Sequence, residues 1–139
     1  AWRVPPGTGD AARRRHAVKR GAAAAASGAD AESLAAEYLV AKGLTIVARN
    51  VRSRFGEIDL IARDGDTLVF VEVRLRRGQA FGGAAASITR AKQAKLVAAA
   101  RVYLANLRRE PPCRFDAVLF DGLDRERATW QRDIIDTSN

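Results

Sequence analysis

The sequence contains one cysteine and one histidine, and these two scarcities exclude several kinds of site. Cys113 cannot form a disulfide within the chain, and no Cys/His cluster surrounds it that could hold a structural zinc ion. His16 stands alone in the N-terminal segment, which excludes a Ser/His/Asp or Cys/His nucleophile. A single thiol suits a reducing compartment, and we expect a cytoplasmic protein.

Long hydrophobic runs are also missing. The longest uninterrupted apolar stretches, 22–26 and 96–100, have five residues each, whereas a membrane-spanning helix needs about 18. Residues 13–29 faintly resemble a signal peptide, but acidic residues follow directly at Asp30 and Glu32. The sequence therefore predicts one domain of 139 residues with no membrane partner.

Acidic residues are absent from residues 73–109, where nine Lys and Arg residues gather. The whole chain has a net charge of +8, which is expected of a protein that meets polyanions, so we predict nucleic acid as the partner. Five acidic residues lie directly before this basic segment, within residues 57–72. Carboxylates beside a basic field suit a metal-dependent enzyme acting on phosphodiesters, while solvated charged faces are the simpler alternative.

Hydrophobic periodicity and turn residues predict six elements. Helices are expected at residues 31–42 and 88–107, and strands at residues 44–51, 57–63, 68–75 and 115–120. Ser87 or Thr89 can cap the second helix, and the glycine-rich residues 76–86 are expected to form a mobile loop. The order αβββαβ predicts an α/β core with a mixed central sheet flanked by helices.

This order also suggests a division of the chain into three parts. Residues 1–26 are expected to form a disordered basic tail, and residues 27–122 the α/β domain. Residues 123–139 are treated as a C-terminal extension, with Trp130 outside the core.

The turn at residues 64–67 predicts a hairpin whose register pairs Asp59 with Glu72 and Glu57 with Arg74. Strand alternation then places these four side chains on one face of the sheet, and directly opposed residues have Cβ atoms roughly 4.5–5.5 Å apart. Two carboxylates so close repel each other unless a cation lies between them, for which Mg²⁺ or Mn²⁺ is the natural candidate.

The opposite face of the same hairpin is expected to carry Ile58, Leu60, Val71 and Val73. The charged face also has an explanation without a metal, in which cross-strand salt bridges neutralise the acids. These bridges would join Glu57 to Arg74, and Glu72 to Arg76 or Arg114.

Four segments, in this order, resemble the bacterial YraN family: GEIDLI at 56–61, VFVEVR at 69–74, FGGAAASITRAKQ at 81–93 and CRFD at 113–116. The resemblance covers about residues 27–122. That family is similar to the restriction-endonuclease-like PD-(D/E)XK superfamily and to archaeal Holliday-junction resolvases. The resemblance implies a restriction-endonuclease-like fold and a divalent-metal-dependent endonuclease acting on DNA, including branched DNA.

Carried over residue by residue, the resemblance implies that Asp59, Glu72 and Glu32 bind Mg²⁺ or Mn²⁺ and take part in catalysis. Arg74 stands where the superfamily has its catalytic lysine, and arginine can clamp a phosphate but cannot accept a proton from water. The residues expected to bind nucleic acid are Arg76, Arg77, Arg90, Lys92 and Lys95. A nucleic-acid-binding protein of the same fold without cleavage is the alternative, and a homodimer would suit a twofold junction.

Overall fold

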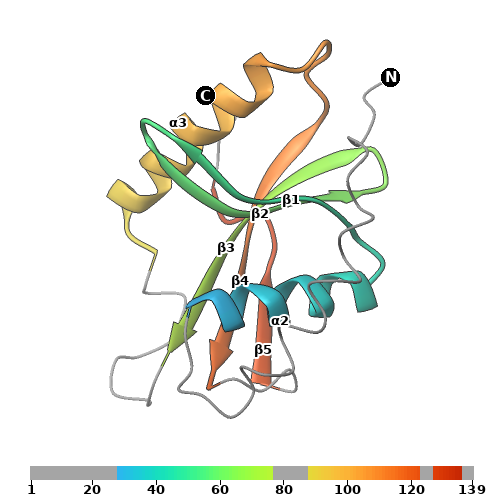
Figure 1. Cartoon of the computed structure of the whole chain (residues 1–139), viewed down its shortest axis with the longest axis vertical. Helices are drawn as coiled ribbons and strands as arrows, with labels where there is room; N and C mark the ends of the chain where they lie inside the picture. The colour runs from blue at the N-terminus through green and yellow to red at the C-terminus, as the bar shows by residue number, and fades with distance from the viewer. Residues whose placement is uncertain (1–27, 77–87, 123–126, 136–139) are drawn as a thin grey trace.

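The computed structural model describes residues 28–76, 88–122 and 127–135, which form a mixed sheet with a helix on each face (Figure 1). The elements are α2 (Gly28–Ala41), β1 (Thr45–Ser53), β2 (Gly56–Asp64), β3 (Thr67–Arg76), α3 (Arg90–Ala105), β4 (Cys113–Asp121) and β5 (Ala128–Gln131). The strands lie in chain order, and every neighbouring pair is antiparallel except β3 with β4. The predicted αβββαβ order is confirmed, and β5 extends it.

Local sequence signals place the ends of the helices. After α2, Gly43 has a φ of 99°, a left-handed conformation that glycine adopts without a steric penalty. Thr89 caps α3, because its side chain accepts a hydrogen bond from the backbone N–H of Lys92 at 3.1 Å. This cap was one of the two predicted positions, and it fixes where Lys92 lies on the first turn of the helix.

The two faces of the sheet bury separate hydrophobic clusters. On one face α2 packs its small side chains and Leu39 against Leu60, Val71 and Phe120. On the other, α3 packs Leu96 and its alanines against strand residues that include Phe70. Because both faces are covered, β2 and β3 are apolar on both sides over most of their length.

The C-terminal segment belongs to this sheet, which the sequence analysis did not predict. Strand β5 pairs with β4, and Trp130 packs against the cluster under α2. The prediction that Trp130 lies outside the core is therefore wrong. Its indole Nε1–H donates a hydrogen bond of 3.0 Å to the fully buried carboxylate of Asp116, which also accepts one from the backbone N–H of Asp133.

Two predictions fall outside the described residues: the disordered tail at 1–26 and all but the first residue of the loop at 76–86. In the described part of the chain, neither helix combines the length and the apolar character that crossing a membrane requires.

Candidate metal and nucleic-acid site

The hairpin of β2 and β3 has the predicted register from its turn as far as Leu60, but the predicted pairs of Asp59 with Glu72 and of Glu57 with Arg74 are not formed. The paired residues run from Asp64 with Thr67 at the turn to Leu60 with Val71. One step further, the carboxylate of Asp59 accepts a hydrogen bond of 2.9 Å from the backbone N–H of Val73. A side chain thus satisfies a strand N–H at the point where β2 and β3 separate.

The predicted division of side chains between the two faces is wrong at this point. Leu60 packs under α2 as expected, but Ile58, which regular alternation would place beside it, packs under α3. The alternation of β2 therefore breaks at Asp59. The physical reason is that β2 follows β1 rather than β3 beyond Leu60, because the β1–β2 pairing continues through Ile58 to the turn.

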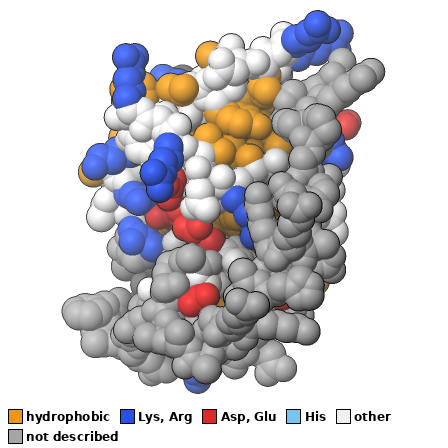
Figure 2. All heavy atoms as spheres, in the orientation of Figure 1, with side chains coloured by type: hydrophobic (Ala, Val, Ile, Leu, Met, Phe, Trp, Pro, Cys, Tyr) orange, Lys and Arg blue, Asp and Glu red, His pale blue; other side chains and the backbone are white. Residues whose placement is uncertain are grey.

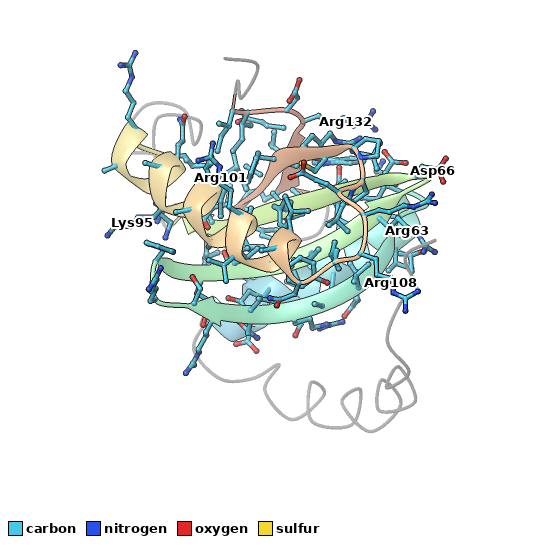
Figure 3. All side chains as sticks on the ribbon, turned by 90° about the horizontal axis from the view of Figure 1, so that it is seen from above. Arg63, Asp66, Lys95, Arg101, Arg108 and Arg132 are labelled. Carbon is cyan, nitrogen blue, oxygen red and sulfur yellow. The ribbon has the colours of Figure 1, made fainter. Side chains whose placement is uncertain are left out.

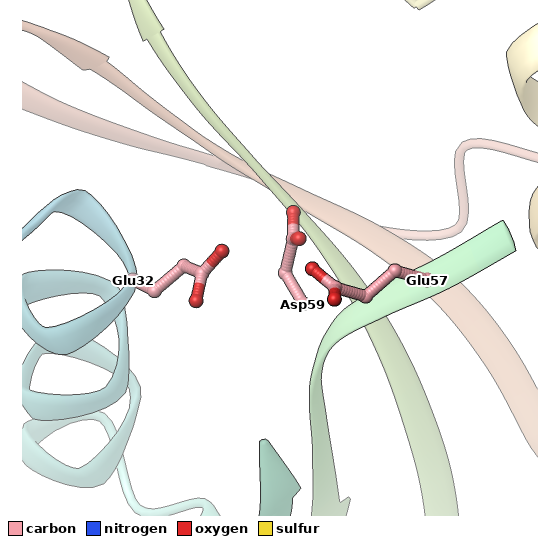
Figure 4. A group of neighbouring side chains, drawn as sticks. All are labelled: Glu32, Glu57 and Asp59. Atoms are coloured by element: carbon pink, nitrogen blue, oxygen red, sulfur yellow. The ribbon is translucent and has the colours of Figure 1, made fainter. Parts of the chain in front are cut away.

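Three carboxyl groups converge where the strands separate. Glu32 from α2 and Glu57 and Asp59 from β2 each offer an oxygen, and these oxygens all lie within 4.8 Å of one another. Figure 4 shows the three side chains pointing toward one another from the helix and the strand. Such a group of hard oxygen ligands is what Mg²⁺ and Mn²⁺ prefer.

Within the acid cluster of Glu32, Glu57 and Asp59, the pKa of Glu32 is raised from 4.5 to about 7. Burial contributes most to this rise, followed by the negative charge of Asp59 and by a hydrogen bond from the protonated Glu32 to Asp59. Asn50 opposes the rise through a hydrogen bond with Glu32, and it holds a left-handed φ of 51° within β1. An asparagine tolerates this conformation better than most residues.

Glu72 lies near the acid cluster, but its side chain is on the face of the sheet that α3 covers. Its side chain is 3% exposed, and its Oε2 lies 3.4 Å from both Lys92 Nζ and Arg74 Nε. Among the described residues, none donates a hydrogen bond to its other oxygen, Oε1. Burial and the charge of Asp59 raise the pKa of Glu72, whereas Lys92 and Arg74 lower it.

These contacts change the predicted arrangement of the four charged hairpin residues. Glu57 and Asp59 face Glu32 on α2, whereas Glu72 and Arg74 meet Lys92 on α3, so the four do not share one face. Asp59 lies between the two groups, since it affects the pKa of both Glu32 and Glu72.

The salt bridges also differ from those expected in the explanation without a metal. Glu57 pairs with Arg52 at 2.9 Å rather than with Arg74. Arg114 pairs with Asp64 and Asp116 and does not reach Glu72. The sequence analysis missed Glu57 as a member of the acid cluster, although its spacing two residues before Asp59 on a strand was the available signal.

Three of the five predicted nucleic-acid-binding residues lie on α3, which covers the face of the sheet opposite α2. Arg90 and Lys95 are exposed on α3, and Lys92 is occupied by Glu72. The side chain of Arg76 and all of Arg77 are outside the described residues. On the face shown in Figure 2, acidic side chains form a patch with Lys and Arg side chains beside it.

The fold and this site define a class: an α/β protein with a mixed sheet between two helices and an acid cluster where two strands separate. The chain belongs to the uncharacterised protein family UPF0102, whose model matches residues 31–120. This confirms the resemblance to the YraN family.

The matches to three relatives cover most of this chain and most of each relative. A UPF0102 protein of Nitrosomonas europaea is 54% identical over 111 residues, which are 80% of this chain and 94% of the relative. A UPF0102 protein of Nitrosomonas eutropha is 61% identical over 95 residues, or 68% of this chain and 82% of the relative. A UPF0102 protein of Cupriavidus taiwanensis is 55% identical over 112 residues, or 80% and 83%.

Proposed function

We propose that the protein is a divalent-metal-dependent endonuclease that acts on DNA in the cytoplasm, with branched DNA among its substrates. The observation that carries this proposal is the convergence of three carboxyl groups, whose oxygens lie within 4.8 Å of one another, with Asp59 also close enough to affect the pKa of Glu72, which contacts Lys92 and Arg74. The carboxylates suit a cation, and the basic residues suit a phosphate backbone.

The donor set fits Mg²⁺ or Mn²⁺. Carboxyl groups this close are stable only when a proton or a cation lies between them, and the raised pKa of Glu32 indicates the proton. Glu72 adds a buried carboxylate oxygen that receives no hydrogen bond from the described residues. Asp59 and Glu32 would hold the ion, with Glu57 and Glu72 next to them. The ion would lower the pKa of a bound water and stabilise negative charge on phosphate oxygens.

Arg74 and Lys92, the two cations beside Glu72, would have separate roles. Arg74 would hold the scissile phosphate, because its guanidinium is always charged and donates several hydrogen bonds in a plane. Lys92 would add a second positive charge at the same place, since its Nζ lies 3.4 Å from the same Glu72 oxygen. Glu72 would keep both cations in position through these contacts.

A second candidate is a nucleic-acid-binding protein of this fold that does not cleave. It is favoured by one observation: Oε2 of Glu72 contacts both Lys92 and Arg74, so the negative charge of Glu72 is neutralised without a metal. The substitution of arginine for the superfamily's lysine at position 74 points the same way.

Asp59→Asn separates the two candidates. In the endonuclease, this change should abolish Mn²⁺ binding measured by calorimetry and should abolish cleavage of branched and linear DNA. DNA affinity without metal should be unchanged or higher, because a negative charge is removed from the binding face. Asp66→Asn, an exposed acid at the β2–β3 turn, is the matched control and should behave like the wild type. If the wild type neither binds Mn²⁺ through Asp59 nor cleaves DNA, the endonuclease proposal is wrong.

A further inference from the structure

Phe55 occupies the tip of the β1–β2 hairpin and is 41% exposed. Among the described residues, the large hydrophobic side chains that are exposed are Phe55, Val40 and Val102, and Phe55 is the one aromatic ring among them. Exposing an aromatic ring to water has a cost, which a binding partner can recover by covering it.

The turn that carries Phe55 is held in one conformation. The hydroxyl of Ser53 accepts a hydrogen bond from the backbone N–H of Phe55 and donates one to the carbonyl of Gly56, each at 3.1 Å. Gly56 has a φ of 142°, which residues with a side chain rarely adopt. A fixed tip presents the ring without the entropy loss that a mobile loop would suffer on binding.

One basic side chain lies over the ring, and another lies beside the next residue. The guanidinium carbon of Arg54 lies 4.9 Å from the centre of the Phe55 ring. Gly56 packs against α3, since a Cβ added there would lie 3.9 Å from the Cβ of Lys95. Figure 3 shows Lys95 at this end of the molecule, away from Arg63 and Asp66 near the other turn.

The tip is also connected to the acid cluster. Arg52, whose side chain is 85% exposed, donates a hydrogen bond to the carboxylate of Glu57, only two residues beyond Phe55. A nucleic-acid strand bound at the acid cluster would therefore pass close to the Phe55 ring and its basic neighbours.

From this placement we propose that the β1–β2 tip, residues 52–56, is a nucleic-acid-binding site in which Phe55 stacks on an unpaired or unstacked base and Arg54 and Lys95 contact phosphates. An aromatic ring among basic groups is the chemistry that recognises exposed bases, because every base has a π face and the backbone is an anion. Binding of a protein partner would not in itself require basic residues beside the ring. The inference rests on the proposed function only in its choice of partner.

The test measures binding without divalent metal, so that it does not depend on cleavage. The probes are a four-way DNA junction, a fully paired duplex and a single-stranded oligonucleotide, the last carrying 2-aminopurine as a stacking reporter. Phe55→Ala should weaken binding to the single strand and the junction by about 5- to 150-fold, the range for loss of one stacked base, and should affect the duplex less. The 2-aminopurine quenching seen with the wild type should be lost.

Matched variants separate stacking from other effects. Phe55→Trp should preserve affinity and quenching, whereas Phe55→Leu should preserve neither. Val40→Ala, which shortens an exposed apolar side chain on α2, should match the wild type. Circular dichroism confirms that each variant is folded.

Other results would overturn the inference. Equal affinity of Phe55→Ala and the wild type for every probe would show that the ring does not touch DNA, and so would a wild type that binds none of them. A change in oligomeric state on sedimentation, with DNA affinity unchanged, would instead assign the ring to a contact between copies of the chain. A wild type that binds through Phe55 but never cleaves would contradict the endonuclease and leave this inference standing.

Discussion

Arg74 is the residue at which this chain departs from the superfamily that it resembles, and its contact with Glu72 gives it a testable role. Arg74→Ala should lower cleavage by about 10²- to 10³-fold, the usual loss when one well-placed donor to a developing charge is removed. Arg74→Lys should retain or increase cleavage, because an amine still reaches the phosphate and can also exchange a proton. Single-turnover cleavage of branched DNA with Mn²⁺ measures both.

A useful comparison for Arg74 is Arg63→Ala, on the same hairpin but near its other end. If Arg74→Ala cleaves as fast as Arg63→Ala and the wild type, Arg74 has no part in the chemistry.

Because the pKa of Glu32 is raised to about 7, the stability of the folded protein should depend on pH. An acid whose pKa is raised on folding binds its proton more tightly in the folded state, so stability without metal falls as pH rises from 4.5 through about 7. Glu32→Gln removes this penalty. Its melting temperature should match the wild type near pH 4.5 and exceed it by a margin that grows until about pH 8.

Thermal unfolding without divalent metal measures this effect, and Glu37→Gln, on the exposed side of the same helix, controls for the change in net charge. A difference between Glu32→Gln and the wild type that is independent of pH would contradict the coupling of Glu32 to Asp59.

Part of the site was predictable from the residues. The hairpin turn at residues 64–67 correctly predicted the register as far as Leu60 and Val71, but not the next pair, Asp59 with Glu72. The spacing of Glu57 from Asp59 could have placed these two acids together, but their approach to Glu32 on α2 was not predictable, because it depends on the separation of β2 from β3 at Asp59. Strand alternation alone assumes that pairing continues.

Strand β5 is the element for which prediction from sequence failed, and the reason lies in its length. Its four residues, Ala128–Gln131, occur in a charged segment and give too short a pattern to identify a strand. Tertiary contacts hold β5 in place. Asp116 on β4 accepts hydrogen bonds from the indole N–H of Trp130 and from the backbone N–H of Asp133, which lie on either side of Gln131. The longer elements, with clear turn residues and caps, were predictable.

The buried carboxylate of Asp116 should therefore contribute strongly to stability. Asp116→Asn keeps the shape but loses the charge that pairs with Arg114 at 3.1 Å, and it turns one acceptor into a donor facing other donors. We expect a loss of about 3–5 kcal/mol in the free energy of unfolding, as for other broken buried pairs. Urea denaturation measures it.

Thr129→Ala is the control for that experiment, since Thr129 is exposed on β5. A loss below about 1 kcal/mol for Asp116→Asn, the usual value of an exposed pair, would mean that β5 does not depend on this carboxylate.

At the scale of the whole molecule, basic charge comes from two separate places. Residues 1–20 carry six Lys and Arg with one acid, and residues 73–109 carry nine with none. Deleting residues 1–20 should weaken duplex binding without abolishing it. The slope of log affinity against log salt should become shallower by about 0.9 for each phosphate contact that is lost.

Fluorescence anisotropy across a salt series tests this prediction. Complete loss of binding in the truncated protein would place the whole nucleic-acid interface in the N-terminal segment and would contradict a role for α3 and the β1–β2 tip.

The one parallel pairing in the sheet has a consequence for how the chain folds. Tight turns join β1 to β2 and β2 to β3. The partner on the other side of β3 is β4, which comes much later in the chain, and their first pair joins Leu68 to Cys113. Contacts so distant in sequence form slowly, because a long loop must close before they contribute. During synthesis the apolar edge around Phe70 emerges well before the strand that covers it. We therefore expect the docking of β4 to limit the folding rate, and chains cut before residue 113 to aggregate through the open edge of β3.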